Sequence, residues 1–175
     1  MEHFYGCHLP STNIFKSIDE VNKHGGNFIQ IFVTNPLGRA SLDALEKYTK
    51  IGPEIKQYAT NNLTKIIVHA PYVLNFAKDF YKHSNEIKRI LLELRIADKI
   101  GAIGCVIHVG KSLKLDINNA VNNMYLSIKY ILSVIKDEKL DVKLILETAA
   151  GQGTELFVTE ENALDDLANF YHRFT

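Results

Sequence analysis

The sequence has 175 residues, which is enough for one domain with a substantial core and too few for two comfortable ones. Its 20 Lys and Arg balance its 20 Asp and Glu, which argues against a non-specific nucleic-acid binder driven by net charge but leaves room for a local basic rim. No apolar run approaches the roughly 20 residues of a membrane helix, and no secretory signal pattern opens the chain, so we expect an intracellular protein without a membrane segment.

The first half of the chain alternates between short apolar runs and segments with helical spacing. Strands are expected at residues 4–8 and 27–33, and a helix over residues 13–23 that Ser11 or Thr12 would cap. A second helix is expected after Ser41 and as far as about Ala59. We expect it to be interrupted at residues 52–53, a Gly-Pro pair, because proline lacks the N–H group that a helix interior needs.

The second half repeats the same alternation. Strands are expected at residues 65–69, 105–108 and 142–147, and helices at 85–100, from Asp116 to about Lys136, and near 160–171. Ser84 and Asp116 are the expected caps of the first two of these helices. The last helix should pack through Leu164, Leu167 and Phe170.

Five strand–helix units without hairpin signals predict an α/β fold with a parallel sheet. The sheet is either open or part of a (β/α)8 barrel, which closes with eight strands and typically takes about 250 residues. Five units do not close that barrel. We therefore expect residues 1–175 to form a single domain that is either an open sheet or an incomplete barrel.

Three of the expected strands end on side chains that bind metals: His69, His108 and Glu147. In a parallel sheet these ends lie at one edge, so the three side chains can converge, and two imidazoles with one carboxylate suit zinc with one coordination position left open. The alternative is that each histidine is a hydrogen-bonded structural residue. His8 ends the first strand at the same edge and is a candidate partner for the metal ligands.

Other residues give weaker signals. Tyr72 is either a packed aromatic or a wedge against a nucleobase, and Arg39 is either a solvated charge or a phosphate contact. The glycines at 151 and 153 favour a tight turn over a nucleotide site, because the loop lacks the spacing and lysine of a P-loop. Cys7 and Cys105 lie in apolar runs, so we expect buried, reduced thiols.

Several stretches together resemble the endonuclease IV family of abasic-site endonucleases, and the resemblance covers nearly the whole chain. Its most specific part is Leu146–Gly153, and His69–Asn75 is similar to the family's histidine-x-x-tyrosine-x-x-asparagine motif. The remaining matches are Gly6–His8, Phe32–Asn35 and Ile107–Ser112.

This resemblance implies a TIM barrel enzyme of DNA base-excision repair that uses three zinc ions. His69 and His108 would bind one zinc, and Glu147 would bridge it to a second and be the catalytic carboxylate. A hydroxide would attack the phosphate 5′ to the abasic site and leave a 3′-hydroxyl, with paired cations stabilising the attacking and leaving oxygens.

The resemblance also implies a partner, double-stranded DNA with abasic sites, and a monomeric full-length enzyme. Asn35, Arg39, Tyr72 and Asn75 would contact this DNA. The loops that carry Arg39 and Tyr72 would enter the minor groove, bend the duplex and help to flip the abasic nucleotide. The match around Arg39 is loose, because residues 36–38 do not align cleanly with the family's loop.

The departures from the family concern the remaining zinc ligands, which the family carries on later strands. Only the first site's ligands and the bridging glutamate have counterparts in this sequence, so we expect a fragment, a truncated product or a chain that needs a partner, with activity at this length an open question. Two alternatives remain: a sugar isomerase or epimerase of the xylose-isomerase-like superfamily, which would favour Mn²⁺ or Mg²⁺, and a non-catalytic module that binds damaged DNA.

Overall fold

Parallel strands form a single sheet in the computed structural model, which describes residues 3–41, 43–158 and 161–174. The strands of this described part are β1 (Gly6–His8), β2 (Phe28–Ile31), β3 (Lys65–His69), β4 (Gly104–His108) and β5 (Lys143–Glu147), and they lie in the order β1-β2-β3-β4-β5. All four pairings are parallel. This is the strand order of a barrel that has been followed for five units, so the predicted α/β fold is confirmed.

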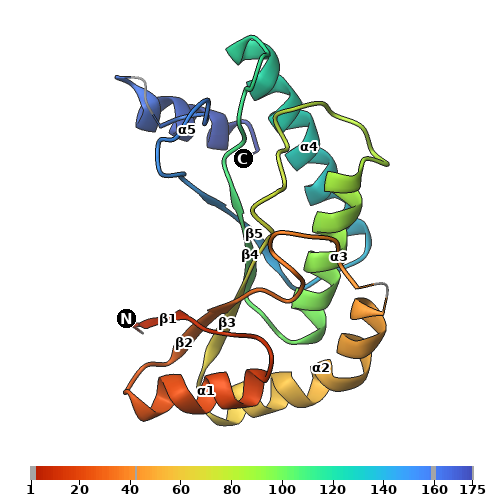
Figure 1. The fold of residues 1–175 in the computed structure, drawn as a ribbon, viewed down its shortest axis with the longest axis vertical. Helices are drawn as coiled ribbons and strands as arrows, with labels where there is room; N and C mark the ends of the chain where they lie inside the picture. Colours follow the sequence, from red (N-terminus) through yellow and green to blue (C-terminus); the bar gives the residue numbers. More distant parts are fainter. Residues whose placement is uncertain (1–2, 42, 159–160, 175) are drawn as a thin grey trace.

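Helices connect successive strands and cover one face of the sheet. They are α1 (Ile14–Lys23), α2 (Ala44–Asn61), α3 (Asn85–Lys99) and α4 (Ile117–Asp137), and α5 (Ala163–His172) follows β5. Figure 1 shows α2, α3 and α4 succeeding one another along one side of the sheet, and neighbouring helices pack against each other. Among the described residues, no helix is both long and apolar enough to cross a membrane.

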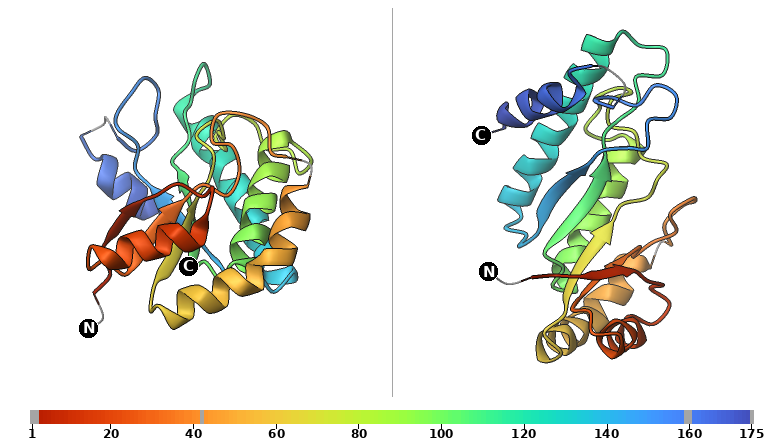
Figure 2. Two further views of the ribbon diagram at one scale, coloured as in Figure 1. Left: turned by 60° about the horizontal axis from the view of Figure 1, so that its bottom comes forward. Right: turned by 90° about the vertical axis from the view of Figure 1, so that its left-hand side faces the viewer.

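The two faces of the sheet differ in character. Side chains alternate along a strand, so Ile29, Ile66 and Cys105 point to the same face and are buried under the helices. The opposite face, which we call the inner face, carries the side chains of the intervening residues and is turned away from the helices (Figure 2). It ends at the carboxyl ends of the strands with His8, His69, His108 and Glu147.

Helix boundaries follow local capping chemistry. Ser84 and Asp116 accept hydrogen bonds from the first turns of α3 and α4, as predicted. The prediction for α1 was wrong by one or two residues, because Asn13 caps the helix by accepting from the N–H of Lys16. The expected start of the last helix near Glu160 lies outside the described residues.

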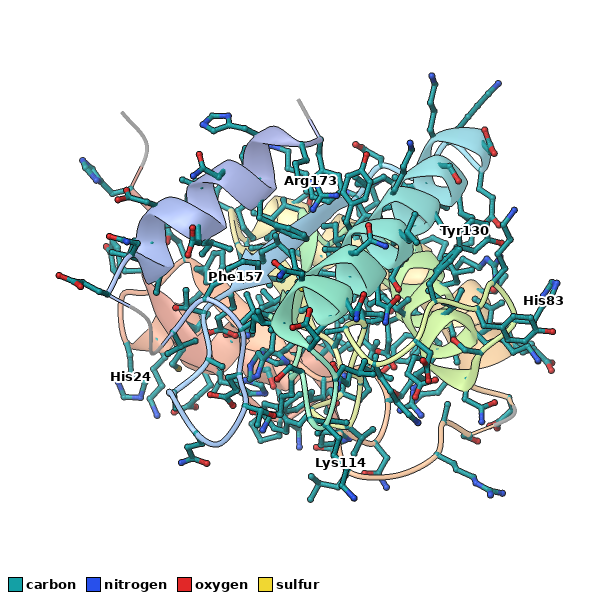
Figure 3. The ribbon with its side chains drawn as sticks, turned by 90° about the horizontal axis from the view of Figure 1, so that it is seen from above. His24, His83, Lys114, Tyr130, Phe157 and Arg173 are labelled. Atoms are coloured by element: carbon teal, nitrogen blue, oxygen red, sulfur yellow. The ribbon has the colours of Figure 1, made fainter. Side chains whose placement is uncertain are left out.

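The fifth helix lies alongside α4 (Figure 3). Phe170 is buried and its ring lies 5.1 Å from that of Phe157, while the guanidinium of Arg173 sits 3.8 Å from the ring centroid of Tyr125 on α4. The expected packing through Leu164 was wrong, since this side chain is 75% exposed. A helix of only ten residues has room for few inward positions, and Ala163 and Phe170 occupy the buried ones.

The predicted interruption of α2 at residues 52–53 was also wrong, because α2 runs unbroken through Pro53. A proline inside a helix costs about 3 kcal/mol, and burial on both sides of it offsets this cost: Tyr48 precedes it, and Ile55 and Ala59 follow it. Cys7 is a further correction, because β1 lies at the edge of the sheet and leaves this thiol exposed, whereas Cys105 is buried and free as expected.

Gly52 provides a test of how closely α2 and α3 pack. A Cβ atom added there would lie 2.8 Å from the main-chain oxygen of Lys99, which is closer than real contacts allow. Gly→Ala inside a helix ordinarily stabilises by about 1 kcal/mol. We expect Gly52→Ala instead to lower the free energy of unfolding by about 1 kcal/mol or more through overpacking, measured by urea denaturation. Lys50→Ala, on the exposed side of the same helix, is the control and should change little; a more stable Gly52→Ala protein would contradict the packing described.

Candidate metal centre

Three adjacent strands deliver His69, His108 and Glu147 to one corner of the inner face. Each residue is the last of its strand, and register pairs His108 directly with Glu147, while His69 pairs with Val106, two residues before His108 on the same face. Apolar, mostly branched residues precede each of them, which favours a strand that is buried on its helix side. The predicted convergence of the three strand ends is therefore present in the structure.

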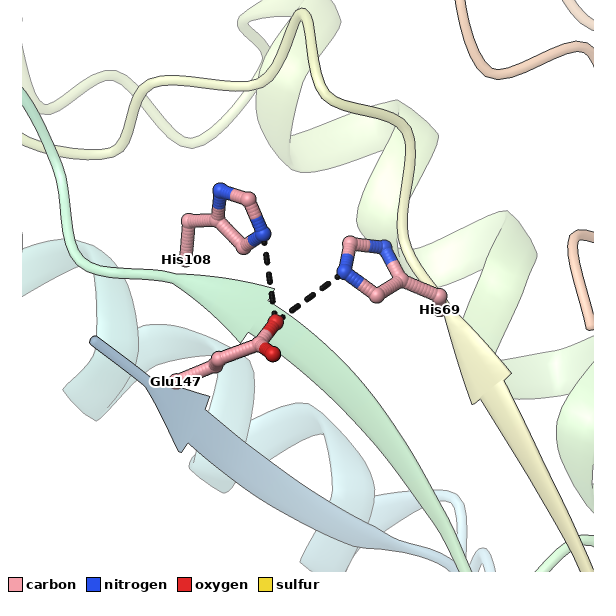
Figure 4. Close-up of side chains that lie close together, drawn as sticks. All are labelled: His69, His108 and Glu147. Atoms are coloured by element: carbon pink, nitrogen blue, oxygen red, sulfur yellow. Dashed lines mark hydrogen bonds and ion pairs between the residues drawn. The ribbon is translucent and has the colours of Figure 1, made fainter. Parts of the chain in front are cut away.

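The three side chains meet at a single oxygen (Figure 4). The Nε2 atoms of His69 and His108 each lie 3.1 Å from Oε2 of Glu147. Neighbouring ligand atoms around a tetrahedral zinc with bonds of about 2.0–2.1 Å lie about 3.3 Å apart. The two His–Glu spacings are close to this value, and all three ligand atoms lie within 4.8 Å of one another. Among the described residues, these three side chains form the one such group of potential metal ligands.

The orientation of His69 fits a ligand role. Its Nδ1 atom lies 2.6 Å from the main-chain oxygen of Ala70. A carbonyl only accepts, so Nδ1 donates to it, and in the neutral imidazole the lone pair of Nε2 then faces the carboxylate of Glu147. A lone pair opposite an anionic oxygen is repulsive unless a proton or a cation lies between them. The donor set and this arrangement together fit a divalent metal.

Accessibility differs among the three residues. The side chain of His69 is 5% exposed, that of His108 35% and that of Glu147 47%. The cluster is therefore anchored from the buried side by His69 and open to solvent on the side of Glu147.

Aromatic rings surround the histidines. Tyr72 is half exposed, and its ring centroid lies 5.0 Å from that of His69, 5.6 Å from that of His108 and 5.1 Å from that of Phe32. The ring of His8 lies 4.5 Å from Phe32 and 6.3 Å from His69. Partial burial, and to a smaller extent the neighbouring His69, lower the pKa of His8. The neutral form of His8 is thereby favoured beside the cluster.

The hydrogen-bond role expected for His8 remains a prediction. The hydrogen-bonding partner of His69 Nδ1 is the Ala70 carbonyl, a residue that sequence reasoning did not single out. Main-chain partners carry no side-chain signal, so only the structure identifies this one. The other four histidines, His3, His24, His83 and His172, are exposed, and Figure 3 places His24 and His83 at the outside of the molecule.

Asn75 ties the loop after β3 to the loop after β4. Its Nδ2 donates to the main-chain oxygen of Lys111, and its Oδ1 accepts from the N–H groups of Lys111 and Ala77. A Cβ atom on Gly110 would lie 2.9 Å from this Oδ1, so the close approach of the two loops needs a glycine at that position. The amide of Asn75 is thus engaged within the chain, and its predicted DNA contact remains untested.

The loop after β5 is fastened to the same rim by Glu155, which sequence reasoning missed. Its carboxylate accepts from the N–H of Gln152 at 2.7 Å and lies 3.2 Å from Nζ of Lys111. The hydrogen bond from Gln152, followed by that from Lys111, lowers the pKa of Glu155. The glycines at 151 and 153 both have positive φ, so the expected tight turn is present. In the sequence, the feature that could have indicated Glu155 is its position in the same loop, eight residues after Glu147.

Asn35 and Arg39 lie in the loop after β2, away from the metal ligands. Both are exposed, and the Oδ1 atom of Asn35 accepts from the N–H of Leu37, which forms a tight turn at the tip. Asn35 lines a shallow groove together with His8 and Phe32, whereas Arg39 lines a second groove with Val73 and Leu74. The structure does not bring these two residues into the cluster.

A model of the family described as xylose isomerase-like TIM barrel matches residues 18–172. A probable endonuclease 4 from Clostridium beijerinckii is 31% identical over 169 residues, which cover 94% of this chain and 58% of that protein. The crystal structure of endonuclease IV from Thermus thermophilus matches 88% of this chain and 55% of its own with a TM-score of 0.56 at 19% identity.

A D-tagatose 3-epimerase-like protein has the same fold, with a TM-score of 0.57, 15% identity, and coverage of 87% of this chain and 56% of that one. The chain spans about half the length of the curated relatives it matches. The chain belongs to the family of xylose isomerase-like TIM barrels, and it is a distant homologue of endonuclease 4 over about half the length of those proteins.

Proposed function

We propose that this chain carries the first metal site of a zinc-dependent abasic-site endonuclease that cleaves the phosphodiester 5′ to the lesion in double-stranded DNA. The observation that carries the proposal is the His69–His108–Glu147 cluster, with both Nε2 atoms 3.1 Å from one carboxylate oxygen, at an open edge of a sheet that is related to endonuclease 4. This chain covers only 58% of the length of such a relative, so the complete endonuclease activity is part of the proposal.

The chain's own residues would divide the work. His69 and His108 would hold the metal through Nε2, and the Ala70 carbonyl would keep the His69 ring in the tautomer that leaves this atom free. Glu147, the most exposed of the three, would be the carboxylate that faces the DNA. A bound zinc ion would supply Lewis acidity towards a phosphodiester. Tyr72 would present its exposed side to the abasic gap, where an aromatic surface can replace the missing base.

The alternatives predict different metals and ligands. A sugar isomerase or epimerase would use Mn²⁺ or Mg²⁺ and gives no reason for an exposed aromatic beside the cluster, and the epimerase-like relative supports the fold alone. A non-catalytic DNA-binding module would keep the metal without incision. The described residues contain no further group of three metal-ligating side chains, and a protein with one metal site is compatible with this non-catalytic alternative. The experiments below therefore distinguish binding from incision.

Metal content tests the cluster directly. We expect the purified chain to bind about one zinc, because His69, His108 and Glu147 provide three ligands to one position, and His69→Ala to lose it. His24→Ala, an exposed histidine that pairs with Glu20, is the matched control and should retain zinc. Elemental analysis after dialysis gives the stoichiometry. Absence of zinc, or a preference for manganese, would refute the zinc assignment.

Glu147→Gln tests catalysis. The amide keeps the shape of the side chain and removes its charge, so incision of an abasic duplex should fall at least about a hundredfold, the scale of losing one interaction with the transition state, while duplex affinity changes little. Gel analysis of cleaved oligonucleotide measures the rate. Glu46→Gln, an exposed carboxylate on α2, should cleave like the parent. Incision unchanged in Glu147→Gln would exclude the catalytic role, and a parent that binds abasic DNA without cutting it would favour the non-catalytic module.

Tyr72→Ala tests the aromatic contact with DNA. Stacking on an aromatic side chain is worth about 1–3 kcal/mol per base, so affinity for an abasic duplex should fall by about 5- to 160-fold with zinc content unchanged. Fluorescence anisotropy of a labelled duplex measures this. Tyr81→Ala removes another exposed tyrosine, which packs on His83, and should bind normally. Equal affinity of the parent for abasic and intact duplexes would eliminate the wedge.

A further inference from the structure

Arg89, on α3, reaches from the helix layer into the loop after β2. Its Nη1 donates to the main-chain oxygen of Gly38 at 3.0 Å, and its Nη2 donates to that of Asn35 at 2.9 Å and also contacts the hydroxyl of Thr34. One guanidinium thereby contacts both ends of the turn that has Asn35 at its start. The planar fork of arginine carries donors on three nitrogens and can span these separated acceptors, whereas the donors of lysine all lie on one nitrogen.

A buried carboxylate holds this guanidinium in place. Glu93, one turn further along α3, is completely buried, and its Oε1 accepts from Nε of Arg89 at 2.9 Å and from the hydroxyl of Thr34. Its other oxygen, Oε2, has no hydrogen-bond partner among the described atoms. Burial raises the pKa of Glu93, and the bonds from Thr34 and Arg89 act against this rise.

A buried, incompletely satisfied carboxylate is costly, because removal of a charge from water is only partly compensated by one ion pair. Hydrophobic packing of α3 does not require it, since Ile90, Leu94 and Ala97 already fill the core around it. The arrangement is therefore better explained by what it positions than by the stability it provides. It positions the loop that contains residues 34–38.

Arg89 also lies near the loop after β3, which carries Tyr72. A groove runs beside Arg89 between Leu37–Ala40 of the loop after β2 and Val73–Leu74 of the loop after β3, the loop that carries Tyr72. Arg89 and Leu92 also line this groove. The guanidinium thus lines a groove that both the loop after β2 and the loop carrying Tyr72 border.

We infer that Arg89, oriented by Glu93, is a positioning residue that fixes loop 34–38 in the conformation that presents Asn35 to abasic DNA. Thr34, Arg89 and Glu93 form what we call the Arg89 clamp. This inference rests on the proposed function, which it deepens by naming residues that act through the loop without contacting DNA themselves.

The variant that tests the clamp is Arg89→Lys, which keeps the charge and loses the fork. Arg95→Met is the matched control, because Arg95 lies on the same helix and makes a two-point ion pair with Glu138, at 2.8 and 2.6 Å, on the outside of the molecule. Glu93→Gln is a second test, since it preserves the side-chain shape and removes the charge that orients Arg89. Zinc content and thermal unfolding of each variant establish that the fold and the cluster persist.

Two readouts are needed. Hydrogen exchange of the peptide that contains residues 34–40 reports the order of the loop without DNA, and we expect it to be at least about tenfold faster in Arg89→Lys and in Glu93→Gln and unchanged in Arg95→Met. Affinity for abasic duplex relative to intact duplex reports the consequence, and we expect this ratio to fall about tenfold in the two clamp variants alone. A merely structural role would leave the ratio unchanged.

Each outcome decides. Exchange that is unchanged in Arg89→Lys would overturn the clamp, and faster exchange with an unchanged affinity ratio would overturn its role in DNA binding. A parent chain that does not distinguish the two duplexes would refute the proposed function and with it the DNA role. Hydrogen exchange would then still show whether Arg89 orders the loop, so the two failures are distinguishable.

Discussion

Parallel hydrogen bonding between β3, β4 and β5 determines where the metal-ligating side chains lie. Register places His108 opposite Glu147, and a slip of one residue in either strand would turn its final side chain into the helix layer. The apolar residues that alternate with the ligands prevent this slip, because Val68 and Ile107 are buried against the helices. Burial of one face of the sheet is therefore what aligns the ligands on the other.

The edge above the ligands is organised in two ways. On the side of β4 and β5, Asn75, Lys111 and Glu155 fasten three loops to one another through hydrogen bonds and an ion pair. On the side of β2, Arg89 and Glu93 of α3 hold the loop through the carbonyls of Asn35 and Gly38 and the hydroxyl of Thr34. The metal cluster thus has loops that are bonded to one another on the side of β4 and β5, and a loop that is bonded to α3 on the side of β2.

Much of this could be predicted from sequence, for identifiable reasons. Short apolar runs that alternate with helical spacing predicted the five units, and residue type at the strand ends predicted His69, His108 and Glu147 as a cluster. Capping chemistry was readable at Ser84 and Asp116, where side chain and turn are adjacent in sequence. Such local features depend on residues that are close in sequence, so they can be predicted without knowledge of the tertiary structure.

The predictions that failed, and the residues that were missed, depend on distant neighbours. Pro53 is a helix breaker by local rules, and the packing of α2 against other helices outweighs it. Arg89 and Glu93 look like an ordinary pair one turn apart on a helix, and nothing near them in sequence indicates that their partners are Thr34, Asn35 and Gly38. The inaccessible position of Glu93 is likewise a property of the assembled layers.

Arg89 and Asn75 hold the loops through hydrogen bonds to main-chain atoms. Arg89 binds the carbonyls of Asn35 and Gly38, and Asn75 binds the N–H and carbonyl groups of Lys111. Every residue except proline offers both groups, so a substitution at Leu37 leaves the bonds from Arg89 intact, and one at Lys111 leaves those from Asn75 intact while removing the ion pair with Glu155. Natural variation can thus change the outward surface of the loops while their backbone path stays the same. The backbone path of the loops therefore does not depend on their outward side chains, and homologues with little sequence in common at these tips can still share one loop geometry.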